Sequence, residues 1–385
     1  MSILFRCVAG LLLVTSFLRA DAQISKSVHY TPLHRIVPAR NLPRGVHTMS
    51  SNNNLDLIRF NGRFFLAFRT APTHFPSKRA KMYIMSSADM KDWTMESEIK
   101  MGSDLREPRF LEFKGKLFLY FFQGGKSPFV FDPIHVYASV YQGDCQWSIT
   151  QLDMDGFVPW RAKEHNGKAW LSAYYGKGLY QADHKADLRL FNSDDGIHWQ
   201  PVDVLPQVAE HGAEEGEFEF DKAGNLWATV RLEGKGAFIA YADKDSLGKW
   251  KLYPVDDKFD SALMFTHDDD IYVISRRNLD GNFAKAPLWW PYFFRQKFNL
   301  VSYSFSSKVT ALFKLDKKCM ALEHVVDFPS TGDNSYPALV TLTDSTYMML
   351  NYSSDINGKS KNWFRGQLGK TYIYQTELLF DKGKL

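Results

Sequence analysis

Several polar residues with reactive side chains stand where segments of alternating apolar and polar residues begin. Arg106, Arg161, Glu215 and Tyr336 each lie at or just before the opening of such a segment. A tyrosine hydroxyl, with a pKa of about 10, becomes a nucleophile when a carboxylate accepts its proton, and arginine binds carboxylates or hydroxyl groups. Because unpaired buried charge is costly, a point where these residues met would be a ligand site.

Six β-hairpins are predicted to carry these residues. The first four turn at Gly62, Gly115, Gly167 and Gly224, which are separated by 53, 52 and 57 residues. The last two turn at residues 268–270 and 343–345. In order, the hairpins span residues 56–69, 108–122, 160–175, 216–231, 261–277 and 336–352.

A second pair of strands follows each of the first four hairpins and ends near a tryptophan. Trp93, Trp147, Trp199 and Trp250 are separated by 54, 52 and 51 residues. A unit of about fifty residues with four short strands is typical of a β-propeller blade, and radial closure protects the sheet edges. The sequence therefore predicts an all-β, six-bladed β-propeller formed by residues 23–385 as a single domain. Because the inner strands of a propeller begin at its axis, the four polar residues are expected to converge at one end of the axial channel.

Two blade ends have the pattern of an Asp-box turn, S-x-D-x-G-x-x-W. Residues 193–199 (SDDGIHW) are a version shorter by one residue, and residues 86–93 (SSADMKDW) are a looser one. In such a turn a hydroxyl and a carboxylate accept backbone N–H bonds while the indole packs between strands. The pattern therefore indicates a fold and not a catalytic site. No amphipathic helix and no linker is predicted.

The first residues resemble a secretion signal. An apolar run at 8–18 is followed by Ala20-Asp21-Ala22, so residues 1–22 are predicted to be removed and the protein to be secreted, to the periplasm or outside the cell. Loss of Arg6, Arg19 and Asp21 takes the net charge from +4 to +3, a balance that favours neither nucleic acid nor an anionic membrane as partner. The run is shorter than the roughly 20 residues that span a bilayer, so no membrane insertion is expected.

Cysteine usage predicts neither a disulfide framework nor a metal site. Of the three cysteines, Cys145 and Cys319 remain after the predicted cleavage. They are expected either to pair in an oxidising compartment or to be two buried thiols. No metal and no cofactor is predicted.

Three parts of the sequence resemble the sialidase superfamily, which includes the BNR-repeat, sialidase-like glycoside hydrolases. They are residues 330–339 with 350–354, residues 104–109, and residues 215–231. The similarity covers nearly all of the predicted mature chain and is specific for the superfamily rather than for one substrate. The resemblance implies a glycan or oligosaccharide substrate.

The resemblance also implies roles for individual residues. In sialidases a tyrosine of the last blade is the nucleophile and a glutamate of the fourth blade takes its proton; Tyr336 and Glu215 match these positions, and Glu217 is a close rival. Sialidases bind the sialic acid carboxylate with three arginines. The candidates here for binding a carboxylate or hydroxyl groups are Arg231, Arg276 (or its neighbour Arg277), Arg106 and Arg161. Further substrate-binding candidates are Asp333, in the last-blade segment, and Asn54, Asp56 and Glu107.

Other positions depart from the sialidase pattern. Where the family has the first arginine of its triad, this chain has Asn54-Leu55-Asp56. The family's acid, an aspartate in the loop after the first hairpin, is replaced by a loop whose titratable group near neutral pH is His74, with Asp56 and Glu107 as alternatives for the same role. The substrate therefore need not be sialic acid.

Three functions are compatible with these residues. The first is a retaining glycoside hydrolase acting on an acidic or otherwise modified sugar. The second is a polysaccharide lyase, in which His74, Tyr336 and Arg161 would neutralise a uronate and abstract the adjacent proton. The third is a non-catalytic glycan-binding propeller. An aromatic insertion at 287–294 is expected to stack on sugars, to contact a partner chain, or to fold back over the fifth blade.

Overall fold

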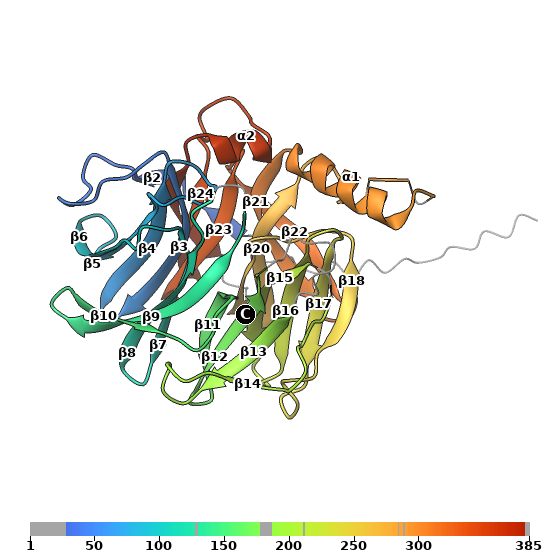
Figure 1. The fold of residues 1–385 in the computed structure, drawn as a ribbon, viewed down its shortest axis with the longest axis horizontal. Helices are drawn as coiled ribbons and strands as arrows, with labels where there is room; N and C mark the ends of the chain where they lie inside the picture. The colour runs from blue at the N-terminus through green and yellow to red at the C-terminus, as the bar shows by residue number, and fades with distance from the viewer. Residues whose placement is uncertain are drawn as a thin grey trace, which may run out of the picture.

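The strands form six small antiparallel sheets arranged in a ring, as predicted (Figure 1). The structure, a computed structural model, describes residues 28–127, 130–177, 187–210, 212–283, 285–287 and 289–381. The predicted signal at 1–22 lies outside these residues. Each hairpin predicted from the sequence forms the two innermost strands of one blade.

Each of the first five blades is a four-stranded antiparallel sheet in which consecutive strands pair. Blade 1 contains β3 (Ser51–Phe60), β4 (Arg63–Ala71), β5 (Lys81–Ser87) and β6 (Trp93–Ile99). Blade 2 contains β7 (Leu105–Phe113), β8 (Lys116–Gly124), β9 (Pro133–Gly143) and β10 (Gln146–Gln151). Blade 3 contains β11 (Phe157–His165), β12 (Lys168–Tyr175), β13 (Leu188–Ser193) and β14 (Gln200–Pro201). Blade 4 contains β15 (Ala213–Phe220), β16 (Leu226–Leu232), β17 (Ala237–Ala242) and β18 (Lys251–Val255). Blade 5 contains β19 (Leu263–His267), β20 (Asp270–Asn278), β21 (Lys308–Asp316) and β22 (Ala321–Phe328).

The sixth blade joins the two ends of the described chain. It contains β23 (Asn334–Thr343), β24 (Thr346–Ser353) and β25 (Tyr372–Phe380), and β25 also pairs with β1 (Val28–Tyr30) and β2 (His34–Val37). The innermost strand β23 in turn contacts β3 of the first blade. The ring is therefore closed by strands from opposite ends of the described chain.

Aromatic side chains fill the spaces between neighbouring blades. Phe118 and Tyr120 stack on β8 with their ring centroids 6.0 Å apart, and Tyr120 meets Trp199 of the next blade at 5.5 Å. Burial of one such ring stabilises the fold by about 2 kcal/mol. The blade-end tryptophans thus contribute to the core between blades.

The two turns singled out in the sequence make the predicted hydrogen bonds. Ser193 Oγ accepts from the Gly196 N–H at 2.9 Å, and Asp195 Oδ1 accepts from the N–H groups of Ile197 and His198, both at 2.8 Å. Ser87 and Asp89 accept backbone N–H groups of the following residues in the same way. These contacts fix the end of the third strand in blades 1 and 3.

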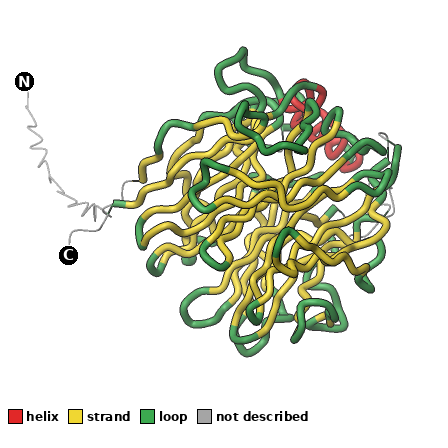
Figure 2. Tube along the Cα trace, turned by 90° about the vertical axis from the view of Figure 1, so that its left-hand side faces the viewer, coloured by secondary structure: helices red, strands yellow, loops and turns green. Residues whose placement is uncertain are grey.

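Two helices interrupt the strands, although the sequence predicted none. Helix α1 (Tyr292–Ser304) lies in the insertion between β20 and β21, and α2 (Trp363–Leu368) lies between β24 and β25. Figure 2 shows the helices together at one edge of the strand body, and the rings of Phe305 and Phe364 are 5.3 Å apart. The described part of the insertion is not packed over the fifth blade along its whole length. Trp289, for example, is 82% exposed.

The cysteines correct another expectation. Cys145 and Cys319 are both free and exposed, so they are neither paired nor buried. Among the described residues, no helix combines the length and the apolar character that crossing a bilayer requires.

Candidate active site

One cavity, of about 280 Å³, collects most of the polar residues that the sequence predicted. Its size is close to the lower end of small-molecule sites, which run from about 300 Å³ upward. Its polar and aromatic lining comes from the inner hairpins of all six blades. Blade 3 contributes Tyr174 of β12 but no residue of β11. The lining residues that carry the argument are Asn54, His74, Arg106, Glu107, Glu214, Glu215, Arg231, Ser261, Arg276, Tyr336, Tyr352 and Trp363.

Bulges in the inner strands aim these side chains into the cavity. Asn54, Glu107, Glu215 and Tyr336 have φ values of +43°, +55°, +52° and +58°, and the strand pairing shifts register at each of them. Ser261, just before β19, has φ +55°. A residue in the left-handed region costs on the order of 1 kcal/mol, and such residues cluster at functional sites. Five blades therefore each place a residue with positive φ in the lining of this cavity.

Tyr336 lies at the centre of this level. Its ring packs against the Arg109 guanidinium, with Cζ 4.3 Å from the ring centroid, and against Trp160 at 5.5 Å. Its hydroxyl is buried and has no hydrogen-bond partner within the described part of the chain. Buried hydroxyl groups are nearly always paired, so this group is available to a ligand or a water.

Glu107 is the carboxyl group with the most unusual environment in the cavity. Its Oε1 accepts a hydrogen bond from Asn54 Nδ2 at 3.0 Å, while no described residue bonds its Oε2, which lies 3.9 Å from Arg109 Nη2. Burial raises the pKa of Glu107 to about 7, and the neighbouring Glu215 charge adds to the effect. Glu107 can therefore both hold and release a proton near neutral pH.

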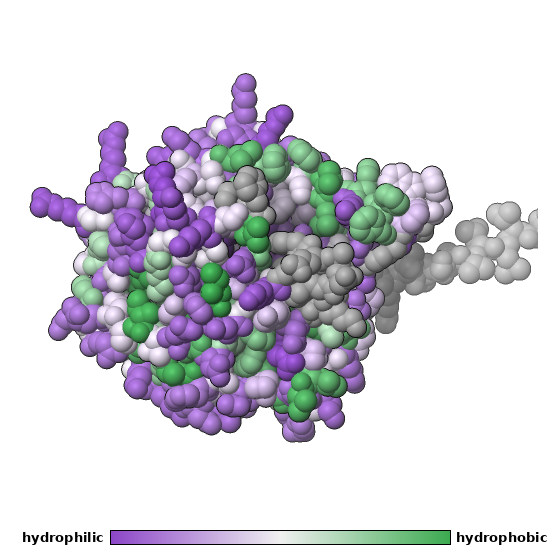
Figure 3. All heavy atoms as spheres, viewed as in Figure 1, coloured by the Kyte–Doolittle hydropathy of each residue, from purple (hydrophilic) through white to green (hydrophobic). Residues whose placement is uncertain are grey.

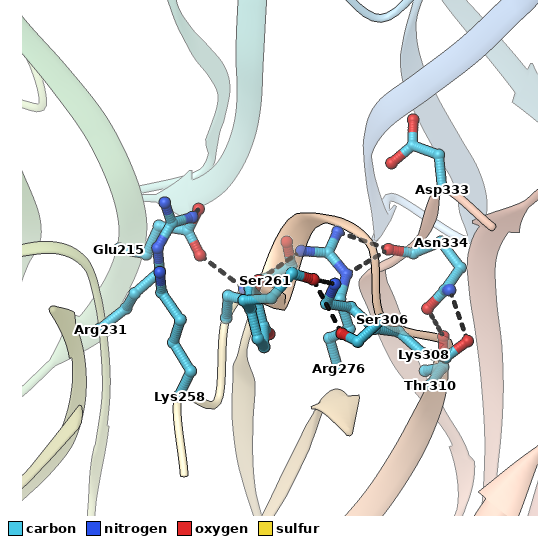
Figure 4. Close-up of polar contacts among 12 residues, drawn as sticks. Glu215, Arg231, Lys258, Ser261, Arg276, Ser306, Lys308, Thr310, Asp333 and Asn334 are labelled. Atoms are coloured by element: carbon cyan, nitrogen blue, oxygen red, sulfur yellow. Dashed lines mark hydrogen bonds and ion pairs between the residues drawn. The ribbon is translucent and has the colours of Figure 1, made fainter. Parts of the chain in front are cut away.

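Glu215 has both carboxylate oxygens bonded (Figure 4). Oε1 is 2.5 Å from Arg231 Nη1, and Oε2 accepts from the Ser261 N–H at 2.6 Å. The described residues show no hydrogen bond between Glu215 and Tyr336, so the sialidase-like pairing of the two is not formed in this structure. Both nevertheless line the same cavity.

Each arginine of the cavity forms several bonds to protein acceptors, although Arg231 Nε has no partner in the described part of the chain. Arg231 bonds Glu214 and Glu233 in addition to Glu215. Arg276 donates from Nη1 to Asp260 at 2.6 Å, and from Nε and Nη2 to the Asn334 carbonyl at 3.0 and 2.6 Å (Figure 4). Arg106 donates from Nε to Asp104 at 2.5 Å and from Nη2 to the His74 carbonyl.

These partners do not use all the donors of the Arg231 and Arg276 guanidinium groups. Arg276 uses three of its five N–H groups, and Arg231 Nε has no hydrogen-bond partner in the described part of the chain. The role of these arginines in binding a carboxylate or hydroxyl groups therefore stays a prediction.

His74 forms part of a buried chain of hydrogen bonds. Its Nδ1 lies 2.7 Å from Asp333 Oδ2, and Asp333 Oδ1 accepts from the Tyr352 hydroxyl at 2.9 Å. Burial lowers the pKa of His74 despite the nearby Asp333 charge. A neutral imidazole whose Nδ1–H donates to Asp333 carries no proton on Nε2. The structure thus favours an accepting role for His74 over the proton-donor role that the sequence suggested. Asp333 is buried and orients His74 rather than lining the cavity.

Arg161 and Asp56 lie elsewhere, which corrects two of the predictions. Arg161 Nε is 2.7 Å from Glu217 Oε2, and its Nη1 is 3.6 Å from Asp56 Oδ1. Arg161 and Asp56 line a separate cavity of about 340 Å³ further along the inner strands. The bulge at Trp160 accounts for the error with Arg161, because it shifts the residues after it to the next level of the channel. Glu217 is fully buried in this pairing, so it is no longer a rival to Glu215.

Several cavity residues were not singled out from the sequence. Glu214 precedes Glu215, Tyr352 ends the sixth hairpin, and Ser261 precedes β19. The sequence contained a partial signal for such residues. Asn54, Glu107 and Glu215 occupy matching positions near the starts of their inner strands, so the same position in the other blades could have been examined. Trp363 had no such signal, because α2 belongs to no repeat.

Comparisons with known proteins support the fold. No family model and no curated protein matches the chain in sequence. A solved protein of unknown function from Dyadobacter fermentans superposes with a TM-score of 0.63 at 16% identity, covering 92% of this chain and all of the other. Trypanosoma rangeli sialidase superposes at 0.59 with 12% identity over 86% of this chain, which spans 55% of that enzyme's length. The Streptococcus pneumoniae sialidase NanB, as a single-site mutant, gives 0.55 with 12% identity, over 88% of this chain and 70% of that one.

The fold is a six-bladed β-propeller, and its solved neighbours include two sialidases. The T. rangeli enzyme has been solved with sialic acid, and with difluorosialic acid as a covalent intermediate. These ligands belong to that enzyme, and identities of this size establish the fold alone.

Proposed function

We propose that the protein is a secreted glycoside hydrolase and that the cavity around Tyr336 is its active site. The observation that carries the proposal is the meeting of three groups in one cavity: a buried tyrosine hydroxyl without a partner, a carboxyl group with a pKa of about 7, and a second, salt-bridged carboxylate. Two carboxyl groups in contrasting environments are the usual means of protonating a leaving group while stabilising positive charge at the anomeric carbon.

In the proposed reaction the Tyr336 oxygen bonds to the anomeric carbon as the glycosidic C–O bond breaks. Glu107 gives its proton to the departing oxygen, and Glu215 takes the proton of Tyr336. Water then attacks the anomeric carbon and passes a proton to Glu107, while the Tyr336 oxygen leaves and regains its proton from Glu215. Two displacements at one carbon retain its configuration. We give the role of proton donor to Glu107 rather than to His74, because the pKa of Glu107 is raised to about 7 while burial lowers that of His74.

The proposed substrate is an acidic or otherwise modified sugar, the class that the sequence suggested. The support is that Arg231 and Arg276 line the cavity and keep N–H groups beyond those bound by their protein partners, which suits them to hold a carboxylate or hydroxyl groups. Asn54, whose Oδ1 has no partner in the described part of the chain, offers a further acceptor for a sugar hydroxyl.

The test is a screen of neutral and acidic glycans with products identified by mass and by ultraviolet absorbance. The wild type is expected to release a saturated sugar, and Tyr336→Phe to release none. Tyr137→Phe removes a hydroxyl that bonds Gln123 outside the cavity, and is the matched control. Undiminished turnover by Tyr336→Phe would exclude the nucleophile assigned here.

A polysaccharide lyase is the second candidate, and the His74–Asp333 pair favours it. An unprotonated Nε2 is a competent base for removing the proton beside a uronate carboxylate. Elimination also needs a cation to neutralise that carboxylate, and Arg231 or Arg276 of the same cavity would have to supply it. An unsaturated, ultraviolet-absorbing product would decide for the lyase, and binding without any product would decide for a glycan-binding propeller.

A further inference from the structure

An apolar ridge runs along the outer face of α1 and continues onto α2. It consists of Phe294, Phe298, Val301 and Phe305, together with Phe364 and Leu368, and their exposed fractions lie between 37% and 60%. Phe294, Phe298 and Val301 of α1 and Phe305, the residue directly after it, follow one another at intervals of 4, 3 and 4, which places them on one side of the helix. Figure 3 shows apolar surface over this part of the molecule. We call this surface the aromatic ridge.

The opposite face of α1 is fixed to the propeller. The Tyr303 hydroxyl donates to Asp260 at 2.5 Å, and Asn299 Oδ1 accepts from the N–H groups of Lys285 and Ala286 at 3.0 and 2.9 Å. Tyr303 and Asn299 are both buried. The aromatic ridge therefore faces solvent because the other side of the helix is held down.

The segments that carry the aromatic ridge are basic. Residues 281–305 and 356–371 contain no aspartate and no glutamate, but they contain Lys285, Arg295, Lys297, Lys359, Lys361, Arg365 and Lys370. The Lys297 ammonium lies 4.3 Å from the centre of the Phe293 ring, at the edge of the aromatic ridge. Phenylalanines bordered by cations, without any anion, are typical of helices that lie in the interface of an anionic membrane.

We infer that the aromatic ridge docks the protein on an anionic lipid bilayer. The rings enter the boundary between headgroups and acyl chains, while Lys297 and Arg365 meet lipid phosphates. A second copy of the chain fits less well, since a two-fold contact through the ridge would bring two sets of like charges together. Trp363 and Gln367 of α2 line the candidate active site, so docking brings the mouth of that cavity to the membrane surface. The inference does not depend on the proposed function.

The test is co-sedimentation of the purified protein with vesicles of phosphatidylcholine, alone or mixed with phosphatidylglycerol. The wild type is expected to bind the mixed vesicles at low salt and to be released by high salt. Phe294→Ser with Phe298→Ser should weaken binding at least tenfold, and Lys297→Gln should weaken it about fivefold, the usual effect of one surface cation. The matched controls are Val204→Ser with Leu205→Ser, two exposed apolar residues of blade 3, and the exposed Lys116→Gln.

Every outcome decides the inference. Binding by the ridge variants equal to that of the wild type would overturn it. The binding would then come from a part of the chain that all variants share, such as the N-terminal residues, and not from the aromatic ridge. Failure of the wild type to bind mixed vesicles would overturn it too. A dimer in sedimentation equilibrium that the paired phenylalanine substitutions dissociate, without vesicle binding, would replace the membrane by a second copy of the chain.

Discussion

Replacement of Glu107 by glutamine should change the pH dependence of stability in a way that can be calculated. Burial raises the pKa of Glu107 from 4.5 to about 7 in the folded protein. Because the folded state holds the proton more tightly, this group supports stability fully below pH 4.5, and the support is lost as the pH rises through 7. The shift corresponds to about 3 kcal/mol in total, of which about 2.5 kcal/mol is lost between pH 5 and pH 8.

The glutamine side chain keeps the acceptor for Asn54 but has no proton to release. The free energy of unfolding of Glu107→Gln, relative to that of the wild type, should therefore rise by about 2.5 kcal/mol from pH 5 to pH 8. Urea denaturation at the two pH values measures this difference. Glu112→Gln changes an exposed residue of the same strand and should behave as the wild type at both. An equal stability difference for Glu107→Gln at pH 5 and pH 8 would refute the assigned pKa.

Two further substitutions test the contacts around the channel. Arg161→Met leaves the fully buried Glu217 without its guanidinium partner. It should lower the free energy of unfolding at pH 7, measured by urea denaturation, by about 3 kcal/mol. A loss below about 1 kcal/mol would contradict the structural role given to Arg161. Asp333→Asn removes the charge that opposes the effect of burial on His74, so the His74 pKa, followed by NMR titration, should fall further below its ordinary value; a rise would contradict the pairing.

The architecture could be predicted because the propeller repeats its signal. Each inner hairpin alternates apolar residues about a turn, and six such hairpins, the first four at nearly constant spacing, indicate a propeller. Helix α1 could not be predicted in this way, because it occurs once, in an insertion, and its apolar stripe faces solvent. The aromatic content of that insertion was visible, but the burial of Tyr303 that orients it depends on Asp260, far away in the sequence.

The site could be predicted only in part, for a reason of register. Tyr336, Glu215 and Arg106 lie within the first three residues of their strands and reach the cavity as expected. Arg161 does not, because a bulge at the preceding residue changes the level that it faces, and a pattern of alternation contains no sign of a bulge. The ion pairs of the cavity could not be predicted either. The carboxylates that pair with Arg231 and Arg276 come from other strands and loops, and the alternation of residues along one strand does not show them.

The most direct test of the account is to trap the proposed covalent intermediate. A fluorinated glycosyl fluoride of the sugar found in the screen should glycosylate Tyr336. The intact mass of the protein should then rise by one fluoroglycosyl group. Peptide mass spectrometry is predicted to place the group on Tyr336 and to find none in Tyr336→Phe. A turnover-competent protein that forms no adduct, or forms it on another residue, would contradict the mechanism.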